Sequence, residues 1–291
     1  MFMIQFLLKV KEGNMRKIIL SIFAMALLIL PSSAATKWTA TDRVAPVGKI
    51  IVEKNSLPAK LQFKIVEDVV NNSQTSKTNV IEVSKADLAY AGNDNEVAAV
   101  IAYELGQIIN GKAGKDNIRA AAKAILSEKL SKDNIVNTTA NSEYWNAKTS
   151  LRDKKEADMT AVDLMVKANY NPLALVVVIT KMPGTNLELI MGQPANADRA
   201  MSAYNYLAYN YPDKVKAGYG CQEYRNFLTY ADPIVEKRNK SKRQVKKFAK
   251  EQEKIKTERA KSLNQYKMSG GLSGWDATYA ILNELSTTEK K

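Results

Sequence analysis

The sequence contains no histidine and only one cysteine. Without histidine there is no imidazole to hold a metal, so any metal site depends on other donors. The single cysteine, Cys221, excludes a disulfide within the chain, and such a thiol is more often a small buried hydrophobe than a link between chains. The N-terminal apolar stretch, residues 18–30, has 13 residues, whereas a membrane-spanning helix needs about 20.

The N-terminus has the features of a secretory signal peptide over residues 1–35. A cationic start at Met15-Arg16-Lys17 precedes the apolar stretch, and small residues follow it. We expect cleavage after Ala34 or Ala35 and an exported protein in the periplasm or at the extracellular face, free or membrane-associated. Because Met15 alone begins a well-formed signal, residues 1–14 fit an upstream mis-start. An uncleaved membrane anchor is the alternative, and no cysteine at the cleavage point supports a lipoprotein.

The net charge of +13 is concentrated in two segments. Residues 1–35 carry +3, and residues 236–261 carry +8 from twelve Lys and Arg against four Glu, which leaves +2 for the remainder. The mature chain therefore divides into a nearly neutral body, a basic helix, and a Gly-rich hinge with a short C-terminal helix. These three parts are predicted at residues 36–233, 234–268 and 269–291.

The body is predicted to be α+β and mainly helical. Clusters of β-branched residues predict short strands at 49–52, 61–66 and 80–83. Apolar spacing and turn signals predict the helices that follow, at 95–109, 117–130, 152–168, 172–182 and from 195 through Tyr206. Further helices are predicted at 234–267 and 275–285.

The pentapeptide Tyr103-Glu104-Leu105-Gly106-Gln107 has the outline of the zinc-protease helix motif His-Glu-x-x-His. In that motif two imidazoles one helical turn apart hold the metal, and the Glu activates the bound water. Here the Glu is present, and Tyr103 and Gln107 replace both histidines. On a helix these two side chains and Glu104 point into a shared space.

Three segments together resemble the HtpX-like and prenyl-protease-like zinc metallopeptidases (metallopeptidase family forty-eight). Residues 95–111 are similar to the active-site helix of that family. Glu156-Ala157-Asp158, followed by a turn at 168–172, is similar to its second metal helix. Gln193-Pro194 with Arg199 is similar to its His-Pro…Arg segment. The resemblance covers about residues 50–210 and implies a zincin-like metallopeptidase fold.

The resemblance also implies a role for each matched position. Glu104 takes the position of the general base and Glu156 that of the third zinc ligand, with Asp158 supporting the ligands. Gln193 and Arg199 take the positions that face the scissile carbonyl and the metal-bound water.

The donor set at these positions is poor for zinc. A tyrosine is protonated near neutral pH, and a glutamine amide is a weak neutral donor. Tyr103, Gln107 and Glu156 thus offer one good ligand where the family offers three. We expect no bound zinc, a vestigial Glu104 and no peptidase turnover. A harder cation held by carboxylates and amide oxygens is a weaker alternative.

The polar side chains at the three motif segments have an alternative to a metal, which is to bond with one another. Tyr103, Gln107 and Gln193 are expected to hydrogen-bond with Glu104, Glu156 and Arg199. A pair between Arg199 and a carboxylate is expected to be the strongest element.

The basic helix has an apolar spacing close to a heptad, interrupted at Gln252, Arg259 and Ser262. It is either a solvated arm or a surface that docks to anionic membrane or cell-wall polymer. The export signal and the lack of interleaved aromatic residues disfavour nucleic acid. The residues expected to make the docking surface are Lys242, Arg243, Lys246, Lys247 and Lys250.

Three functions remain open from the sequence. The first is an exported, catalytically inactive metallopeptidase homologue that binds or scaffolds an envelope protein or peptide through its protease-like cleft or its basic helix. The second is an active metalloendopeptidase with zinc in an unusual ligand set. The third is a structural envelope protein that docks through its basic helix. The oligomeric state is not specified by any motif.

Overall fold

The computed structural model describes residues 37–67, 80–110, 135–184, 188, 190–193 and 195–268. Contacts divide the chain into two units, Met1–Trp38 and Thr39–Lys291, and every element below belongs to the second. The predicted signal peptide, the predicted helices at 117–130 and 275–285, and the Gly-rich hinge lie outside the described residues.

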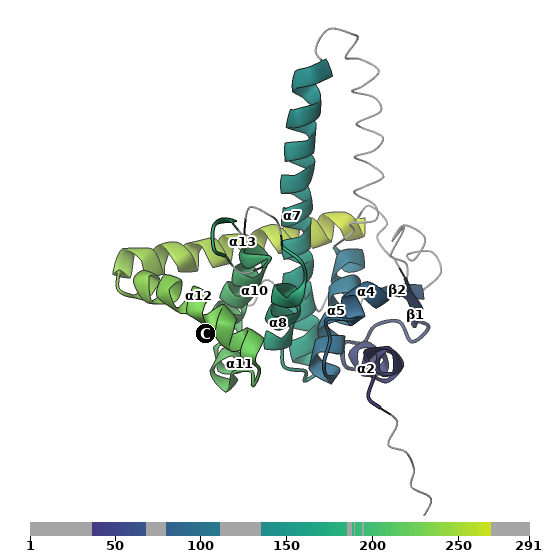
Figure 1. Cartoon of the computed structure of the whole chain (residues 1–291). Coiled ribbons are helices and arrows are strands. Elements are labelled where there is room, and N and C mark those ends of the chain that lie inside the picture. The colour runs from purple at the N-terminus through teal and green to yellow at the C-terminus, as the bar shows by residue number, and fades with distance from the viewer. Residues whose placement is uncertain are drawn as a thin grey trace, which may run out of the picture. The chain divides into compact units, whose positions relative to one another are not determined.

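The second unit is mainly helical with one small sheet, which confirms the expected class (Figure 1). Its described elements are α2 (Ala40–Lys54), β1 (Gln62–Val66), β2 (Val80–Ser84), α4 (Lys85–Leu88), α5 (Asp94–Ile109), α7 (Ile135–Lys167), α8 (Leu173–Lys181), α10 (Ala197–Asn210), α11 (Pro212–Ala217), α12 (Gln222–Asn239) and α13 (Lys242–Met268).

Two of the three predicted strands are confirmed. β1 and β2 pair in parallel, with Gln62 opposite Val80 and Val66 opposite Ser84. The third, at 49–52, is wrong because these residues belong to α2. Thr39 caps this helix through the backbone N–H of Asp42, and its buried apolar residues recur at the three- and four-residue spacing of a helix face.

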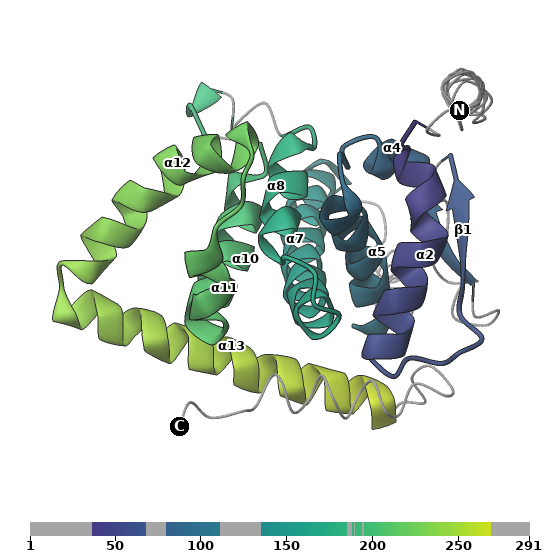
Figure 2. The same ribbon diagram turned by 90° about the horizontal axis from the view of Figure 1, so that it is seen from below.

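The predicted helices at 95–109, 172–182 and from 195 are confirmed as α5, α8 and α10. The helix predicted at 152–168 is the C-terminal half of α7, which starts at Ile135. α5 lies between α2 and α7 (Figure 2), and it is buried along its length from Glu96 to Ile109. Its apolar character on all sides is typical of a helix in the centre of a helical domain.

The predicted single basic helix over 234–267 is wrong, because it consists of two helices. α12 ends at Asn239, and α13 begins at Lys242. α12 also runs through residue 233, where the sequence predicts the end of the body. Two of the three residues that interrupt the predicted heptad, Gln252 and Arg259, are buried. The C-terminal half of α13 is therefore packed against the helical core instead of forming a solvated arm.

Candidate functional site

The helices that carry the pentapeptide at 103–107 and the Glu-Ala-Asp segment at 156–158, α5 and α7, cross in direct contact. A Cβ added at Gly106 would lie 2.5 Å from the carbonyl oxygen of Ala157, so this position of α5 needs a residue without a side chain. The side chain of Asn110, at the end of α5, donates to the Thr160 hydroxyl of α7 at 2.8 Å. This crossing brings the pentapeptide at 103–107 next to the Glu-Ala-Asp segment at 156–158.

The three polar positions of the pentapeptide are all buried. Tyr103 is 9% exposed, Glu104 2% and Gln107 6%. The Gln107 amide nitrogen donates to Glu104 Oε2 at 3.0 Å, as predicted for the polar groups of this segment, because buried polar groups need hydrogen-bond partners. Glu104, at the predicted general-base position, thus accepts a hydrogen bond from within its own helix, α5.

Arg199 of α10 forms a bidentate pair with Asp158 of α7. Its Nε and Nη2 lie 3.0 and 2.7 Å from the two carboxylate oxygens, and both side chains are buried. The guanidinium also lies 4.8 Å from the centre of the Tyr103 ring, within the range of a cation–π contact. Of the carboxylates at the site, Asp158 rather than Glu104 or Glu156 is the partner of Arg199.

Burial determines the charge states at this site. It raises the pKa of the Tyr103 phenol well above its usual value, although the nearby Arg199 lowers it. Tyr103 is therefore a neutral phenol at physiological pH. Burial likewise raises the pKa of Asp158, while the Coulomb attraction and hydrogen bonds of Arg199 lower it. The bidentate geometry is that of an ionised carboxylate with a guanidinium.

The remaining two predicted site residues lie at its edge. Glu156 is half-buried on the surface of α7, and its backbone carbonyl accepts from the Thr160 hydroxyl at 3.1 Å. Gln193 is also half-buried, and its backbone N–H donates to the Glu188 carbonyl at 2.9 Å. Within the described residues, the Gln193 side chain joins none of the hydrogen bonds around Glu104 and Arg199.

These residues do not fit a zinc ion. Tyr103 is held as a neutral phenol, and the Gln107 amide nitrogen is directed to Glu104. Among the residues that the structure describes, no group of three or more His, Cys, Asp or Glu side chains is arranged to hold a metal. A catalytic zinc site needs about three nitrogen, thiolate or carboxylate ligands, and this arrangement supplies fewer.

A second buried polar cluster lies deeper between α7 and the helices that pack on it, and the sequence did not predict it. We name it the Arg259 network. The Arg259 guanidinium of α13 donates to Asp163 at 3.1 Å, to the Tyr206 hydroxyl at 2.7 Å and to the Thr160 hydroxyl at 3.0 Å. The hydroxyls of Tyr206 and Tyr211 also donate to Asp163.

One sequence signal for the Arg259 network exists in α7. Asp163 lies among the apolar positions of a buried helix face, between Val162 and Leu164. A carboxylate in such a place requires a cationic or hydrogen-bonding partner. The sequence does not indicate which of its many Lys and Arg residues that partner is.

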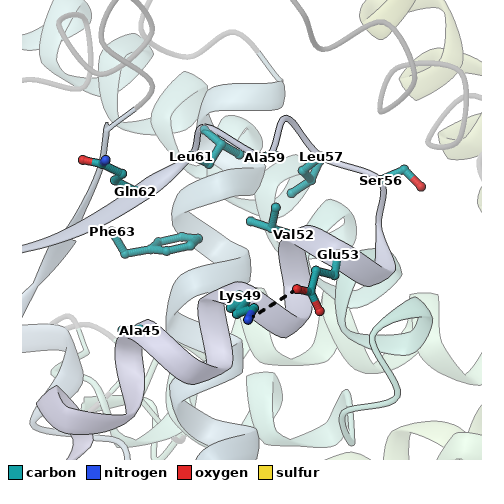
Figure 3. A pocket seen from close by; sticks show the side chains of 10 residues that line it. All are labelled: Ala45, Lys49, Val52, Glu53, Ser56, Leu57, Ala59, Leu61, Gln62 and Phe63. Atoms are coloured by element: carbon teal, nitrogen blue, oxygen red, sulfur yellow. Dashed lines mark ion pairs between the residues drawn. The ribbon is translucent and has the colours of Figure 1, made fainter.

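The structure also has an open cavity of about 500 Å³ away from these residues (Figure 3). It lies between α2 and the segment that leads into β1, with Val52, Leu57, Leu61 and Phe63 on its apolar side. Lys49 and Glu53 form an ion pair at its edge. None of the predicted site residues, from Tyr103 to Arg199, lines this cavity.

Comparison of the chain with protein-family models, curated proteins and solved structures found no match. None of the described helices has both the length and the apolar character needed to cross a bilayer.

Proposed function

We propose that this chain is an exported, non-catalytic protein with a zincin-like fold, similar to the zinc metallopeptidases that its three motif segments resemble. In this proposal it binds or scaffolds a protein or peptide partner in the cell envelope. Glu104 is a vestigial general base, and the polar groups around it stabilise the fold.

The observation that carries this proposal is the internal bonding of the motif residues. Gln107 donates to Glu104, and Arg199 is paired with Asp158. A peptidase of this kind needs a metal-activated water beside a free carboxylate, and a peptide needs access to it. Glu104 is only 2% exposed, so the accessible part of the site is its edge, at Glu156 and Gln193. We expect the partner to contact this edge.

Metal analysis and a peptide-cleavage assay with and without chelator test the absence of catalysis. We expect no stoichiometric zinc and no chelator-sensitive cleavage, because the donor set supplies too few ligands. Stoichiometric zinc together with chelator-sensitive cleavage that Glu104→Gln abolishes would show that the protein is an active metalloendopeptidase.

Restoring the imidazoles tests the zincin-like geometry separately. The double variant Tyr103→His with Gln107→His is expected to bind one zinc ion, and adding Glu156→Gln should weaken that binding because it removes the third ligand. A matched control, Arg225→His with Thr229→His, places two imidazoles at the same spacing on the exposed face of α12. It should bind zinc weakly and independently of Glu156. Equal affinity in the two double variants would contradict the fold assignment.

A further inference from the structure

α13 has two faces of different character. Its buried residues are Gln252, Lys256, Arg259, Ala260 and Leu263. At about 100° per residue these positions share one side of the helix. That side packs against the core, and Arg259 fixes it there through its bonds to α7 and α10.

The N-terminal part of α13 carries exposed cations on another side. These residues, which we name the basic stripe, are Lys242, Arg243, Lys246, Lys247 and Lys250. On a helical wheel they occupy an arc of about 140° that begins at the edge of the buried side and extends away from it. Within the described residues none of the five forms an ion pair with a carboxylate, and residues 242–250 include no Asp or Glu.

The basic stripe is held in a fixed orientation at the junction of α12 and α13. The Arg238 guanidinium of α12 stacks over the Phe248 ring of α13, with its centre 3.7 Å from that of the ring. It also donates to Asn205 of α10 at 2.8 Å. These contacts keep Phe248 on the core side of α13, so the cations remain on the solvent side.

We propose that the basic stripe docks the protein on the anionic headgroups of a lipid bilayer. Five closely spaced cations without counter-charges are electrostatically complementary to an anionic surface. Four of the five are lysines, which act as point charges rather than as the planar donors that read bases or single phosphates.

Nucleic acid is the less suitable polyanion for this surface. Binding of single strands relies on aromatic side chains that stack bases, and the basic stripe has none. The docking proposal depends only on α13, so it stands independently of the metallopeptidase-like site.

Vesicle co-sedimentation of the purified full chain tests the proposal. Vesicles of phosphatidylcholine with phosphatidylglycerol provide the anionic surface, and pure phosphatidylcholine provides the neutral one. The test variant carries Arg243→Gln, Lys246→Gln, Lys247→Gln and Lys250→Gln. The matched control carries Lys37→Gln, Lys54→Gln, Lys60→Gln and Lys64→Gln, which removes the same charge from exposed positions elsewhere.

We expect the unmodified protein to bind the anionic vesicles, and high salt to weaken this binding. Because each cation near such a surface contributes about fivefold, the loss of four cations should weaken binding on the order of 600-fold in the test variant. The control should lose much less, and neutral vesicles should bind all three proteins equally. Circular dichroism should show equal helical content in the three proteins.

Three results would overturn the proposal. Equal losses in the test variant and the control would mean that net charge alone governs binding. Tighter binding of a short nucleic acid duplex than of the vesicles would identify a different polyanion. Retention on isolated cell-wall sacculi without binding to vesicles would assign the stripe to a wall polymer.

Discussion

Two buried arginine–aspartate pairs lie five residues apart on the same helix, α7, yet their surroundings differ. Among the described residues, Asp158 accepts hydrogen bonds from Arg199 alone, two in number. Asp163 is held by Arg259 and by the hydroxyls of two tyrosines. Both carboxylates are fully buried, and burial raises the pKa of each. The comparison shows two ways to keep a buried carboxylate satisfied, by one bidentate partner or by several shared donors.

The difference determines what remains when the arginine is removed. A carboxylate left alone in the interior pays the full cost of its desolvation. Among the described residues Asp158 then has no other hydrogen-bond donor, whereas Asp163 keeps Tyr206 and Tyr211. Because Asp158 depends on a single partner, the Arg199 pair should be more sensitive to the loss of its arginine than the Arg259 network is.

Arg199→Met is therefore expected to have the largest effect on stability. Breaking a buried ion pair on one side costs about 3–5 kcal/mol, and the lost stacking on Tyr103 adds to this. Urea denaturation followed by circular dichroism measures the free energy of unfolding. A loss below about 1 kcal/mol would mean that Asp158 finds another partner or solvent.

The pH dependence of the Arg199→Met deficit checks its cause. Without the guanidinium the pKa of Asp158 rises further, so the folded variant takes up a proton that the unfolded chain binds less tightly. A carboxyl whose pKa is higher in the folded state loses stability as pH rises from the unfolded value through the folded one. The deficit should be largest near neutral pH. It should shrink as the pH falls toward about 5, by up to about 1.4 kcal/mol for each pH unit. A deficit that is constant with pH would contradict this explanation.

Arg259→Met is expected to have a smaller effect, about 2–3 kcal/mol, because two tyrosine hydroxyls still bond to Asp163. Combining it with Tyr206→Phe and Tyr211→Phe removes those donors and should make the loss as large as that of Arg199→Met. Arg225→Met, at an exposed position of α12, is the control and should stay within about 0.5 kcal/mol of the unmodified protein. If Arg259→Met alone is the more destabilising of the two arginine variants, the comparison is wrong.

The sequence predicts the Arg199 pair in outline but not the Arg259 network. Arg199 lies in a segment that resembles a known motif, so its partner could be sought among a few carboxylates. The sequence left that carboxylate unspecified, and the structure identifies it as Asp158. Arg259 lies among many Lys and Arg residues of a helix with a polar composition, where burial of one particular side is set by packing rather than by periodicity.

The dependence of burial on packing also explains the other differences between the predicted and the observed elements. The β-branched residues at 49–52 favour a strand locally, but α2 forms because its apolar face packs on α5. Elements with a long apolar sequence and clear ends, such as α5 and α8, are predictable from sequence alone. The close contact at Gly106 is not, because the sequence gives no distance between α5 and α7.

Gly106→Ala tests whether the two pairs depend equally on the contact between α5 and α7. In a helix this substitution normally stabilises by about 1 kcal/mol, but here the new Cβ would lie 2.5 Å from the Ala157 carbonyl oxygen. We expect a loss of about 1–2 kcal/mol from the forced separation, whereas Gly220→Ala, which has open space around it, should be near neutral. Because Ala157 adjoins Asp158, Gly106→Ala should be more strongly non-additive with Arg199→Met than with Arg259→Met in double-mutant cycles. Equal coupling would mean that α7 shifts as a rigid body and affects both pairs alike.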